Sequence, residues 1–308
     1  MFKQKFKEKN NILIFEKNNN FSKLIDEFYS ADPFPNYNED DNKLSLLNKG
    51  NKNIIAKKIK KEIGFGNKIL EVGSGTSQLS QYFALGTNNE VVAFDVAYDS
   101  LKLGSQFSIK NNIKNINFIN GDIFDEIFEL NYFDLVWCSG VLHHTKDPKA
   151  GFSQIIKYLR KNGYIVIGLY NLYGRFFTKI RQLIYKILPK YFKKTFIVFF
   201  DPYLRSLKDK TKNRLKINSW IKDQYEHPHE SSHTIDEVLN WFSQENITFI
   251  NSIPATNFES KINSKILNKT TKGTFFERTF NQLSMIFNSF GKEGGLFVVI
   301  GKKNDCTK

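Results

Sequence analysis

The sequence predicts an α/β fold, in which a doubly wound and mostly parallel sheet carries helices between its strands. Short apolar runs alternate with longer helical segments, and strands that are joined through helices pair in parallel. The first run also leads through a glycine corner directly into a helix. The runs lie at 68–72, 91–95, 116–119, 133–138 and 164–170, and the helices at 77–85, 99–110 and 147–160.

The flanking segments are predicted as additions to one domain. The expected parts are an N-terminal extension or lid (1–50), a ligand-binding core (51–171), a basic helical cap (172–233) and a C-terminal part of the core (234–308). A helix at about 51–62 leads into the first strand. The aromatic loop at 31–37, stiffened by two prolines, is placed to fold over the mouth of the site.

The C-terminal part is predicted to return the chain to the sheet. Thr234 begins a helix as its N-cap, with Glu237 as the capping-box partner. Two further strands are expected at 247–250 and 296–300, with a substrate-side excursion at 253–294 between them.

Gly73, Ser74 and Gly75 form the corner between the first strand and its helix. Glycine lets the backbone turn sharply and lets a ligand approach the main chain. The start of the helix offers free N–H groups and the positive end of a dipole. Because such corners at the carboxyl ends of parallel strands bind nucleotide-like ligands, we expect one here. Gln78 stands where a dinucleotide fingerprint has its third glycine, and no G-K-[ST] phosphate loop follows.

Two carboxylates beside this corner narrow the choice of ligand. Glu71 lies two residues before Gly73, where it would repel a pyrophosphate but suit a cationic amine. Asp95 ends the second strand, where a carboxylate can accept both hydroxyls of a ribose. An amino acid at one end and a ribose at the other describe S-adenosylmethionine (SAM). Taken alone, Asp95 could cap the next helix and the glycines could mark an ordinary turn.

Four blocks in order within 68–171 resemble the class I SAM-dependent methyltransferases. After the glycine corner they comprise Gly121-Asp122-Ile123, the strand and loop at 133–145, and the turn into the fifth strand at 159–168. The resemblance implies a Rossmann-like fold whose last two strands form an antiparallel pair at the sheet edge. This chain departs from the family at Ser77, where many members carry a third glycine, and at Lys161-Asn162 in the turn.

The same resemblance implies a cofactor site built from residues at the ends of these strands. Asp122 would hold the adenine amino group, Ile123 would pack on the adenine ring, and the main chain at Ser139 would shape the pocket. The expected cofactor-binding residues are Glu71, Gly73, Ser74, Gly75, Asp95, Val96, Asp122, Ile123 and Ser139. No metal ligand belongs to this set.

Composition sets the outer limits of function. The 308-residue chain is 41% apolar, which is enough for a substantial core. Its two cysteines, Cys138 and Cys306, argue against a disulfide framework and for a reducing compartment. The first residues lack the apolar core of a signal peptide, and no run reaches the ~18 apolar residues of a membrane span. We therefore expect a cytoplasmic enzyme.

The net charge of +14 is concentrated between residues 174 and 216, which hold thirteen Lys or Arg and two acids. Within this segment Phe177, Ile180 and Ile184 recur at helical spacing until Pro189 stops the run. Basic amphipathic helices can lie on anionic membranes or on RNA. The alternative is a helical cap whose apolar face packs inward and whose lysines are solvated. The two interpretations are compatible.

All five histidines fall into two clusters. His143 and His144 follow the fourth strand, and three more lie within 227–233. These side chains could face the methyl acceptor as hydrogen-bond donors or as a general base, because an imidazole exchanges protons near neutral pH. His144 is the first candidate for this role, and His229 and Tyr225 are the second. A structural role or a metal site are the alternatives, and the proline in the second cluster disfavours a metal.

These observations predict a SAM-dependent methyltransferase that acts on an O, N or C nucleophile of a small-molecule acceptor, since two insertions would enclose a pocket. RNA (tRNA or rRNA), a lipid or a quinone is the alternative acceptor, prompted by the basic segment. Outside this class, an NAD-dependent oxidoreductase is disfavoured by Gln78 and by the Asp122 block. An inactive SAM-fold binding protein is disfavoured by the intact motif set.

Overall fold

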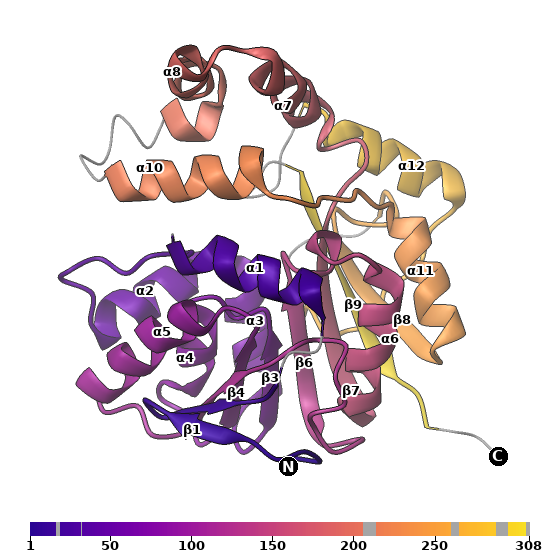
Figure 1. The fold of residues 1–308 in the computed structure, drawn as a ribbon. Helices are drawn as coiled ribbons and strands as arrows, with labels where there is room; N and C mark the ends of the chain where they lie inside the picture. The colour runs from indigo at the N-terminus through magenta and orange to yellow at the C-terminus, as the bar shows by residue number, and fades with distance from the viewer. Residues whose placement is uncertain (17–18, 32, 206–213, 260–264, 288–294, 306–308) are drawn as a thin grey trace.

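In the part of the chain that the structure, a computed structural model, describes, the strands form one nine-stranded sheet (Figure 1). The structure describes all residues except 17–18, 32, 206–213, 260–264, 288–294 and 306–308. The strands are β1 (Lys7–Lys9), β2 (Ile12–Ile14), β3 (Lys68–Val72), β4 (Glu90–Asp95), β5 (Ile116–Asn120), β6 (Phe133–Ser139), β7 (Leu159–Tyr170), β8 (Ile247–Ile253) and β9 (Leu296–Lys303). Their order across the sheet is β1-β2-β5-β4-β3-β6-β7-β9-β8.

β3 lies in the middle of the sheet, and the strands that follow it in the chain are added on both sides. β3 pairs in parallel with β4 and with β6, and β9 runs antiparallel to both β7 and β8. The connecting helices are α4 (Gln78–Ala84), α5 (Tyr98–Lys110) and α6 (Pro148–Tyr158). The predicted doubly wound, Rossmann-like sheet with an antiparallel last strand is therefore confirmed. The carboxyl ends of β3 to β6 meet at one edge, where open α/β sheets bind their ligands.

Alternate side chains of each strand enter two cores, one on each face of the sheet. Leu70 of β3 joins a core that contains Phe152 of α6. Ile69 joins the opposite core, which contains Ile59. Glu71 lies on the same face of β3 as Ile69, so the alternation carries a carboxylate into an apolar layer beside the glycine corner.

The N-terminal extension begins with a β-hairpin, which the sequence pattern does not predict. β1 and β2 pair across Asn10 and Asn11, whose φ angles of 54° and 58° suit the primed turns of hairpins. β2 then pairs in parallel with β5 and widens the sheet. Strands of three residues carry too short a pattern to be recognised. The helices that follow are α1 (Asn20–Ala31), α2 (Lys43–Lys52) and α3 (Ile54–Ile63), the last of which matches the predicted first helix.

Four described helical segments lie above the carboxyl edge of the sheet, with α1 between them and the strands (Figure 1). They are α7 (Phe176–Ile187), α8 (Lys190–Phe200), α10 (Arg214–Ile221) and the π-helical turn η2 (Lys222–Glu226), and together we call them the cap. The cap has a small core of its own, which includes Tyr185, Ile197 and Trp220. Within the described residues, no helix is long and apolar enough to cross a membrane.

The C-terminal part returns to the sheet as expected, through α11 (Ile235–Gln244), β8, α12 (Phe275–Ser284) and β9. The Thr234 hydroxyl accepts a hydrogen bond from the Glu237 N–H at 3.2 Å, as predicted. The Glu237 carboxylate lies 3.0 Å from Nδ1 of His233 instead of returning to the Thr234 N–H. The predicted capping box is therefore wrong in its second half.

Candidate active site

The glycine corner is held from both sides of β3. The N–H groups of Gly73 and Ser74 donate to the Phe94 carbonyl of β4, at 2.8 and 3.1 Å. Gly73 has a φ of 69°, and a Cβ there would lie 2.1 Å from Cγ2 of Val141. The corner therefore needs glycine both for its turn and for the close approach of the loop that follows β6.

Ser77, at the position of the family's third glycine, has a left-handed backbone conformation, which glycine adopts more easily. It is fully buried, with φ 62° and ψ 26°. α5 passes so close that a Cβ added to Gly104 would lie 2.9 Å from Oγ of Ser77. A non-glycine residue in this left-handed region costs about 1 kcal/mol. The departure from the family pattern is thus accommodated with a strained backbone.

Asp95 and Asp122 lie at the ends of neighbouring strands, and main-chain N–H groups orient both carboxylates. Asp95 accepts from the N–H of Gly75 and from the N–H of Ala97, each at 2.7 Å. Asp122 accepts from the N–H of Phe124 at 3.0 Å and from the hydroxyl of Ser22 in α1 at 2.5 Å. Each carboxylate oxygen can accept more than one hydrogen bond.

The edge between these acids fits an adenosyl-bearing ligand. Val96 and Ile123 follow the two acids and are half-buried. The Ser139 hydroxyl packs against β7, where a Cβ on Gly168 would lie 2.0 Å from it. A Cβ on Gly140 would meet no atom within 4 Å, which leaves open space beside the end of β6. Paired acceptors, half-buried apolar side chains and open space suit ribose and adenine.

Glu71 is buried behind the glycine corner and is kept close to neutral. Burial raises the pKa of Glu71 to about 8, although hydrogen bonds from Ser80 in α4 oppose the rise. A cation placed near this carboxylate would favour its ionised form. Glu71 can therefore respond to an ammonium group by releasing a proton.

Residues 34–37 of the expected covering loop pack on the glycine corner. A Cβ on Gly75 would lie 2.3 Å from the Phe34 carbonyl oxygen. The Pro35 carbonyl accepts from the Thr76 hydroxyl and, at 3.1 Å, from Nε2 of Gln78. The Tyr37 hydroxyl donates to the Thr76 carbonyl at 2.7 Å. This loop thus covers the main chain of the corner.

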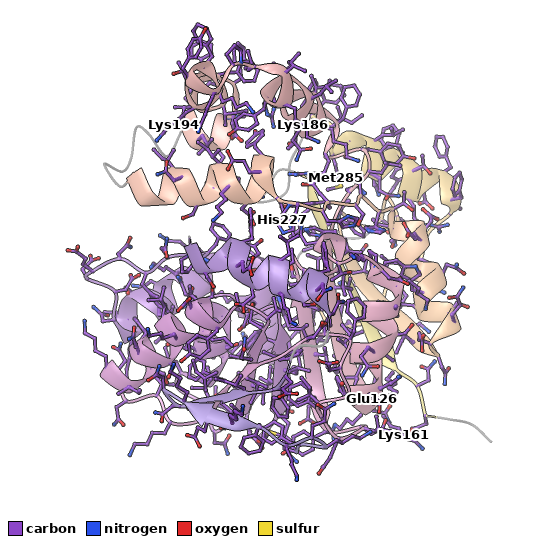
Figure 2. The ribbon with its side chains drawn as sticks, viewed as in Figure 1. Glu126, Lys161, Lys186, Lys194, His227 and Met285 are labelled. Carbon is purple, nitrogen blue, oxygen red and sulfur yellow. The ribbon has the colours of Figure 1, made fainter. Side chains whose placement is uncertain are left out.

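The two histidine clusters meet in space, beside the loop that covers Gly73. The 3₁₀ turn η1 (Leu142–His144) follows Val141 directly. The His144 ring lies 3.8 Å from the His227 ring and 4.3 Å from the His143 ring, centre to centre. Figure 2 places His227 between α1 and the cap. The sequence clusters therefore form one histidine cluster next to the cofactor edge.

A single carbonyl orients two of these rings. The His229 main-chain oxygen lies 2.9 Å from Nδ1 of His144 and 2.6 Å from Nδ1 of His227. Because a carbonyl only accepts, we assign the His144 proton to Nδ1, which leaves a lone pair on Nε2. Nε2 of His227 is buried without a hydrogen-bond partner among the described residues. The two Nε2 atoms could therefore accept a hydrogen bond or a proton from a bound ligand.

Burial keeps this cluster uncharged. It lowers the pKa of His144 to about 4 and the pKa of His227 to about 3, and it holds the pKa of His143 well below its ordinary range. Charge repulsion from the neighbouring rings adds to the effect for His143 and His227. All three rings are therefore neutral at pH 7 and can accept protons.

A charged network closes the cluster on the cap side. The Arg175 guanidinium, fully buried, lies 3.8 Å above the Tyr170 ring and donates to Glu230 at 2.5 Å and to Gln224 at 2.6 Å. The Tyr170 ring in turn stacks on His143 with 3.8 Å between centres. The Arg175 guanidinium, paired with Glu230, thus joins the start of the cap to Tyr170 of β7.

The structure separates the three candidate catalytic residues. His144 lies in the cluster, whereas His229 contributes its carbonyl and turns its ring toward Phe21 of α1, 5.9 Å away. The Tyr225 hydroxyl is engaged inside the cap, where it donates to Asp201 at 2.7 Å and accepts from Arg181. Burial and the nearby Asp201 raise the pKa of Tyr225. This environment fits a structural hydroxyl better than a base.

Four residues beside the cofactor edge and the histidine cluster are missing from the candidates that the sequence gives. They are Ser22, Tyr29, Tyr170 and Arg175. They are common polar residues far apart in the chain, and only the packing of α1 and the cap brings them together.

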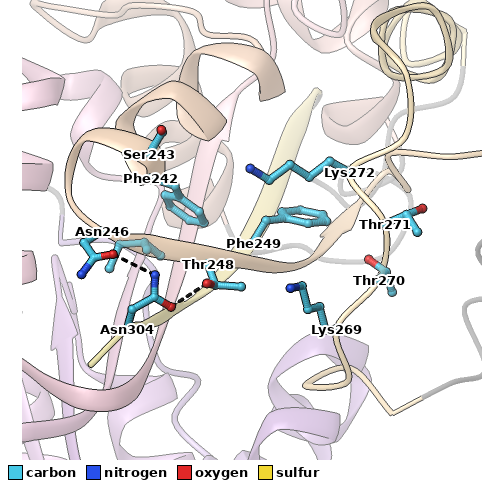
Figure 3. Close-up of a pocket in the computed structure, with 11 residues that line it drawn as sticks. Phe242, Ser243, Asn246, Thr248, Phe249, Lys269, Thr270, Thr271, Lys272 and Asn304 are labelled. Atoms are coloured by element: carbon cyan, nitrogen blue, oxygen red, sulfur yellow. Dashed lines mark hydrogen bonds between the residues drawn. The ribbon is translucent and has the colours of Figure 1, made fainter. Parts of the chain in front are cut away.

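Two surface pockets lie outside the cofactor edge. One, of about 450 Å³, opens between α7 and the loop 227–230, so it borders the histidine cluster. The other, of about 460 Å³, lies on the far side of β8 (Figure 3). There Asn304 bonds to both Asn246 and Thr248, at 2.9 and 2.5 Å. Of these two pockets, the first is the one that adjoins the histidine cluster.

The chain has the fold of the class I SAM-dependent methyltransferases, a family whose cofactor is S-adenosylmethionine. The chain belongs to the family described as "Methyltransferase domain", whose model matches residues 64–220, half of the chain. An uncharacterized protein of Synechococcus is 30% identical over 118 residues, which span 38% of this chain and 28% of that protein. The ubiquinone biosynthesis O-methyltransferase of Glaesserella parasuis is 28% identical over 134 residues, 41% of this chain and 56% of that protein.

Solved structures share the fold at low identity. PKMT2 from Rickettsia typhi in complex with AdoHcy has a TM-score of 0.55 and 14% identity, over 78% of this chain and 49% of that one. The [4+2]-cyclase SpnF has a TM-score of 0.51 and 10% identity, over 92% and 96%. The alignments cover about a quarter to just over half of the first curated relatives. A cyclase shares this fold as well, so the fold alone does not name the acceptor.

Proposed function

We propose that this enzyme moves the methyl group of SAM to a small-molecule acceptor held between the glycine corner and the histidine cluster. The observation that carries the proposal is the position of His144. It follows Val141, which packs on Gly73, and its Nε2 lone pair is free of the carbonyl that orients the ring. The methyl donor and a proton acceptor would therefore share one edge of the sheet.

The chain would hold the cofactor through the residues that end its central strands. Glu71 would steady the methionyl amine, and the main chain from Gly73 to Gly75 and at Ser139 would line the pocket. Asp95 would accept the ribose hydroxyls, and Asp122 the adenine amine, with apolar contact from two half-buried side chains. Those two side chains are Val96 and Ile123. When bound, SAM supplies a methyl group on a sulfonium, which is already a good electrophile.

The acceptor side has to orient the nucleophile and remove its proton. His144 Nε2 would take the proton of a hydroxyl or amine as the new bond to the methyl carbon forms. A base whose pKa is about 4 is neutral at pH 7 but weak, so we expect proton loss and methyl transfer to be concerted. His227, stacked on His144, would exclude water and share the proton.

A lipid-soluble, quinone-like acceptor is the second candidate. Two curated relatives bear the names ubiquinone biosynthesis O-methyltransferase and demethylmenaquinone methyltransferase. The pocket beside the histidine cluster also has Leu183 and the stems of Lys179 and Lys186 on its α7 side. An amphiphilic molecule would find apolar and cationic contacts there.

Transfer of a labelled methyl group tests the proposal. Purified enzyme is incubated with SAM labelled in its methyl group and with a cell extract split into small-molecule, lipid and RNA fractions. We expect label in the small-molecule or lipid fraction, and a loss of that label in the His144→Ala enzyme. Label in the RNA fraction alone, or equal transfer by His144→Ala, would contradict the proposal.

A further inference from the structure

The outer surface of the cap is apolar to a degree that its own packing does not explain. A surface helix normally buries one apolar stripe and exposes polar residues on the opposite face. α7 and α8 already bury Tyr185 and Ile197 in the core of the cap. They nevertheless expose nine further large apolar side chains, namely Phe176, Phe177, Ile180, Leu183, Ile187, Tyr191, Phe192, Phe199 and Phe200.

These exposed side chains lie among positive charges only. Residues 176–200 contain six Lys or Arg and no Asp or Glu. Lys179, Lys186, Lys190 and Lys194 are exposed along the two helices, and Figure 2 shows Lys186 and Lys194 on the cap, at the opposite end of the molecule from Lys161. A surface that is apolar and uniformly positive is complementary to an apolar phase with a negative boundary.

α12 extends the same surface. Its exposed side chains are Phe275, Phe276, Phe280 and Leu283, followed by Phe287. The end of α12 abuts the start of α7, since a Cβ on Gly174 would lie 3.3 Å from Cβ of Met285. Figure 1 shows α12 beside α7 on the same side of the molecule. We call the exposed residues of α7, α8 and α12 the outer face.

The pocket that borders the histidine cluster opens next to this face. Leu183 and Lys186 belong to the outer face and also line the pocket, whose other wall is the loop 227–230. A molecule that leaves an apolar phase at the outer face would therefore meet the histidine cluster without passing through bulk water.

We propose that the outer face docks on an anionic lipid bilayer, with α7 and α8 lying in the plane of the headgroups. The exposed aromatic and aliphatic side chains enter the acyl boundary, and the lysines contact lipid phosphates. The inference deepens the second candidate function, the lipid-soluble acceptor, and rests on it in one respect: the methyl acceptor is an amphiphile dissolved in that bilayer. Docking itself requires neither SAM nor acceptor.

Vesicle co-sedimentation of the full chain, without SAM, tests the docking alone. The probes are vesicles of phosphatidylcholine and vesicles of phosphatidylcholine with phosphatidylglycerol. We expect the wild-type chain to pellet with the anionic vesicles and to be released by salt. A chain that stays in the supernatant with both vesicles overturns the proposal, whatever its methyl-transfer activity.

Paired variants separate the two contributions. Lys186→Glu with Lys190→Glu should weaken partitioning at least about 25-fold, because each lysine near an anionic surface contributes roughly five-fold. Ile187→Gln with Phe199→Gln should weaken it by about ten-fold or more, because both side chains leave the apolar phase. Ile187 and Phe199 are 77% and 63% exposed, so their substitution should not unfold the chain. Thermal melting of the variant checks this.

Matched controls carry the same changes away from the outer face. Lys114→Glu with Lys161→Glu alters the net charge equally, and Leu44→Gln with Phe65→Gln removes equally exposed apolar groups. Both controls should pellet like the wild type. Equal losses in controls and outer-face variants would overturn the proposal.

Two other occupants of this face give different results. If charge reversal abolishes binding while Ile187→Gln with Phe199→Gln leaves it intact, the face binds a polyanion such as RNA by electrostatics and the proposal is wrong. If light scattering shows a dimer that the apolar pair converts to a monomer, and no vesicle binding occurs, the face is covered by a second copy of the chain.

Discussion

The cofactor edge and the histidine cluster hold their polar groups in opposite ways. At the edge, main-chain N–H groups donate hydrogen bonds to the carboxylates of Asp95 and Asp122. In the cluster, burial favours the neutral form of His144 and His227. A methyl transfer needs both environments, since a cationic donor is bound beside a nucleophile that must lose a proton. Glu71, behind the glycine corner, is an acid that burial keeps mostly protonated at pH 7.

Removing the proton acceptor should have the largest effect. His144→Ala should lower kcat by about 10²–10⁴-fold, the range for loss of a general base. SAM affinity should stay close to that of the wild type, because His144 belongs to the acceptor side. Steady-state kinetics with calorimetry of SAM binding measures both.

His229→Ala is the matched control for that variant. It keeps the main-chain carbonyl that orients the two rings and deletes only the side chain. We expect an activity similar to that of the wild type. Equal losses in the two variants would show that the His229 ring, and not its carbonyl, takes part.

Glu71 should make stability fall with rising pH. Its folded pKa of about 8 lies above the ordinary value near 4.5, so the folded chain holds a proton that the unfolded chain releases. The free energy of unfolding therefore declines as pH rises from about 4.5 to 8. Glu71→Gln should remove this decline and raise the free energy of unfolding at pH 8 by roughly 2–4 kcal/mol. Denaturant titration at pH 5 and pH 8 measures the difference.

SAM should release this proton when it binds. The ammonium of the methionyl end favours the ionised carboxylate, so affinity should rise with pH up to about pH 8. Calorimetry in two buffers of different ionisation enthalpy counts the released protons. A Glu71→Gln variant that still releases a proton would exclude Glu71 as its source.

The histidine cluster should make the chain sensitive to acid. The folded pKa values of His144 and His227, about 4 and about 3, lie below the unfolded value, so stability is lost as pH falls below 6.5. At pH 5 each ring should reduce the free energy of unfolding by about 2 kcal/mol. His227→Leu should flatten this dependence. A wild-type stability that is constant from pH 7 to pH 5 would contradict a buried, neutral cluster.

Ser77 gives the smallest expected effect. Ser77→Gly should raise the free energy of unfolding by about 0.5–1 kcal/mol, because it relieves the left-handed backbone. Ser77→Val should lower it by about 2 kcal/mol or more, since a β-branched residue suits neither this φ nor the contact with α5. Thermal melting of the three proteins ranks them.

The sequence predicts the central strands and the glycine corner well because their signals are local. The glycine corner directly follows β3, and an acid is the last residue of β4. The histidine cluster depends on contacts between residues far apart, such as Nδ1 of His144 and the carbonyl of His229, 85 positions later. No spacing rule tells which of His227 and His229 turns its ring toward His144. Tyr225 lies close to the second histidine cluster in sequence, but its hydroxyl donates to Asp201 within the cap.

Calorimetry of SAM binding to the wild type and to Asp95→Ala tests the central claim most directly. The account predicts saturable binding of SAM and of its demethylated product by the wild type. It predicts a loss of about 100-fold in Asp95→Ala, where a charged acceptor for two ribose hydroxyls is missing. Asp99→Ala, a nearby acid in α5 that does not end a strand, should bind like the wild type. A wild-type chain that takes up no SAM, or an Asp95→Ala chain that binds it unchanged, would contradict the account.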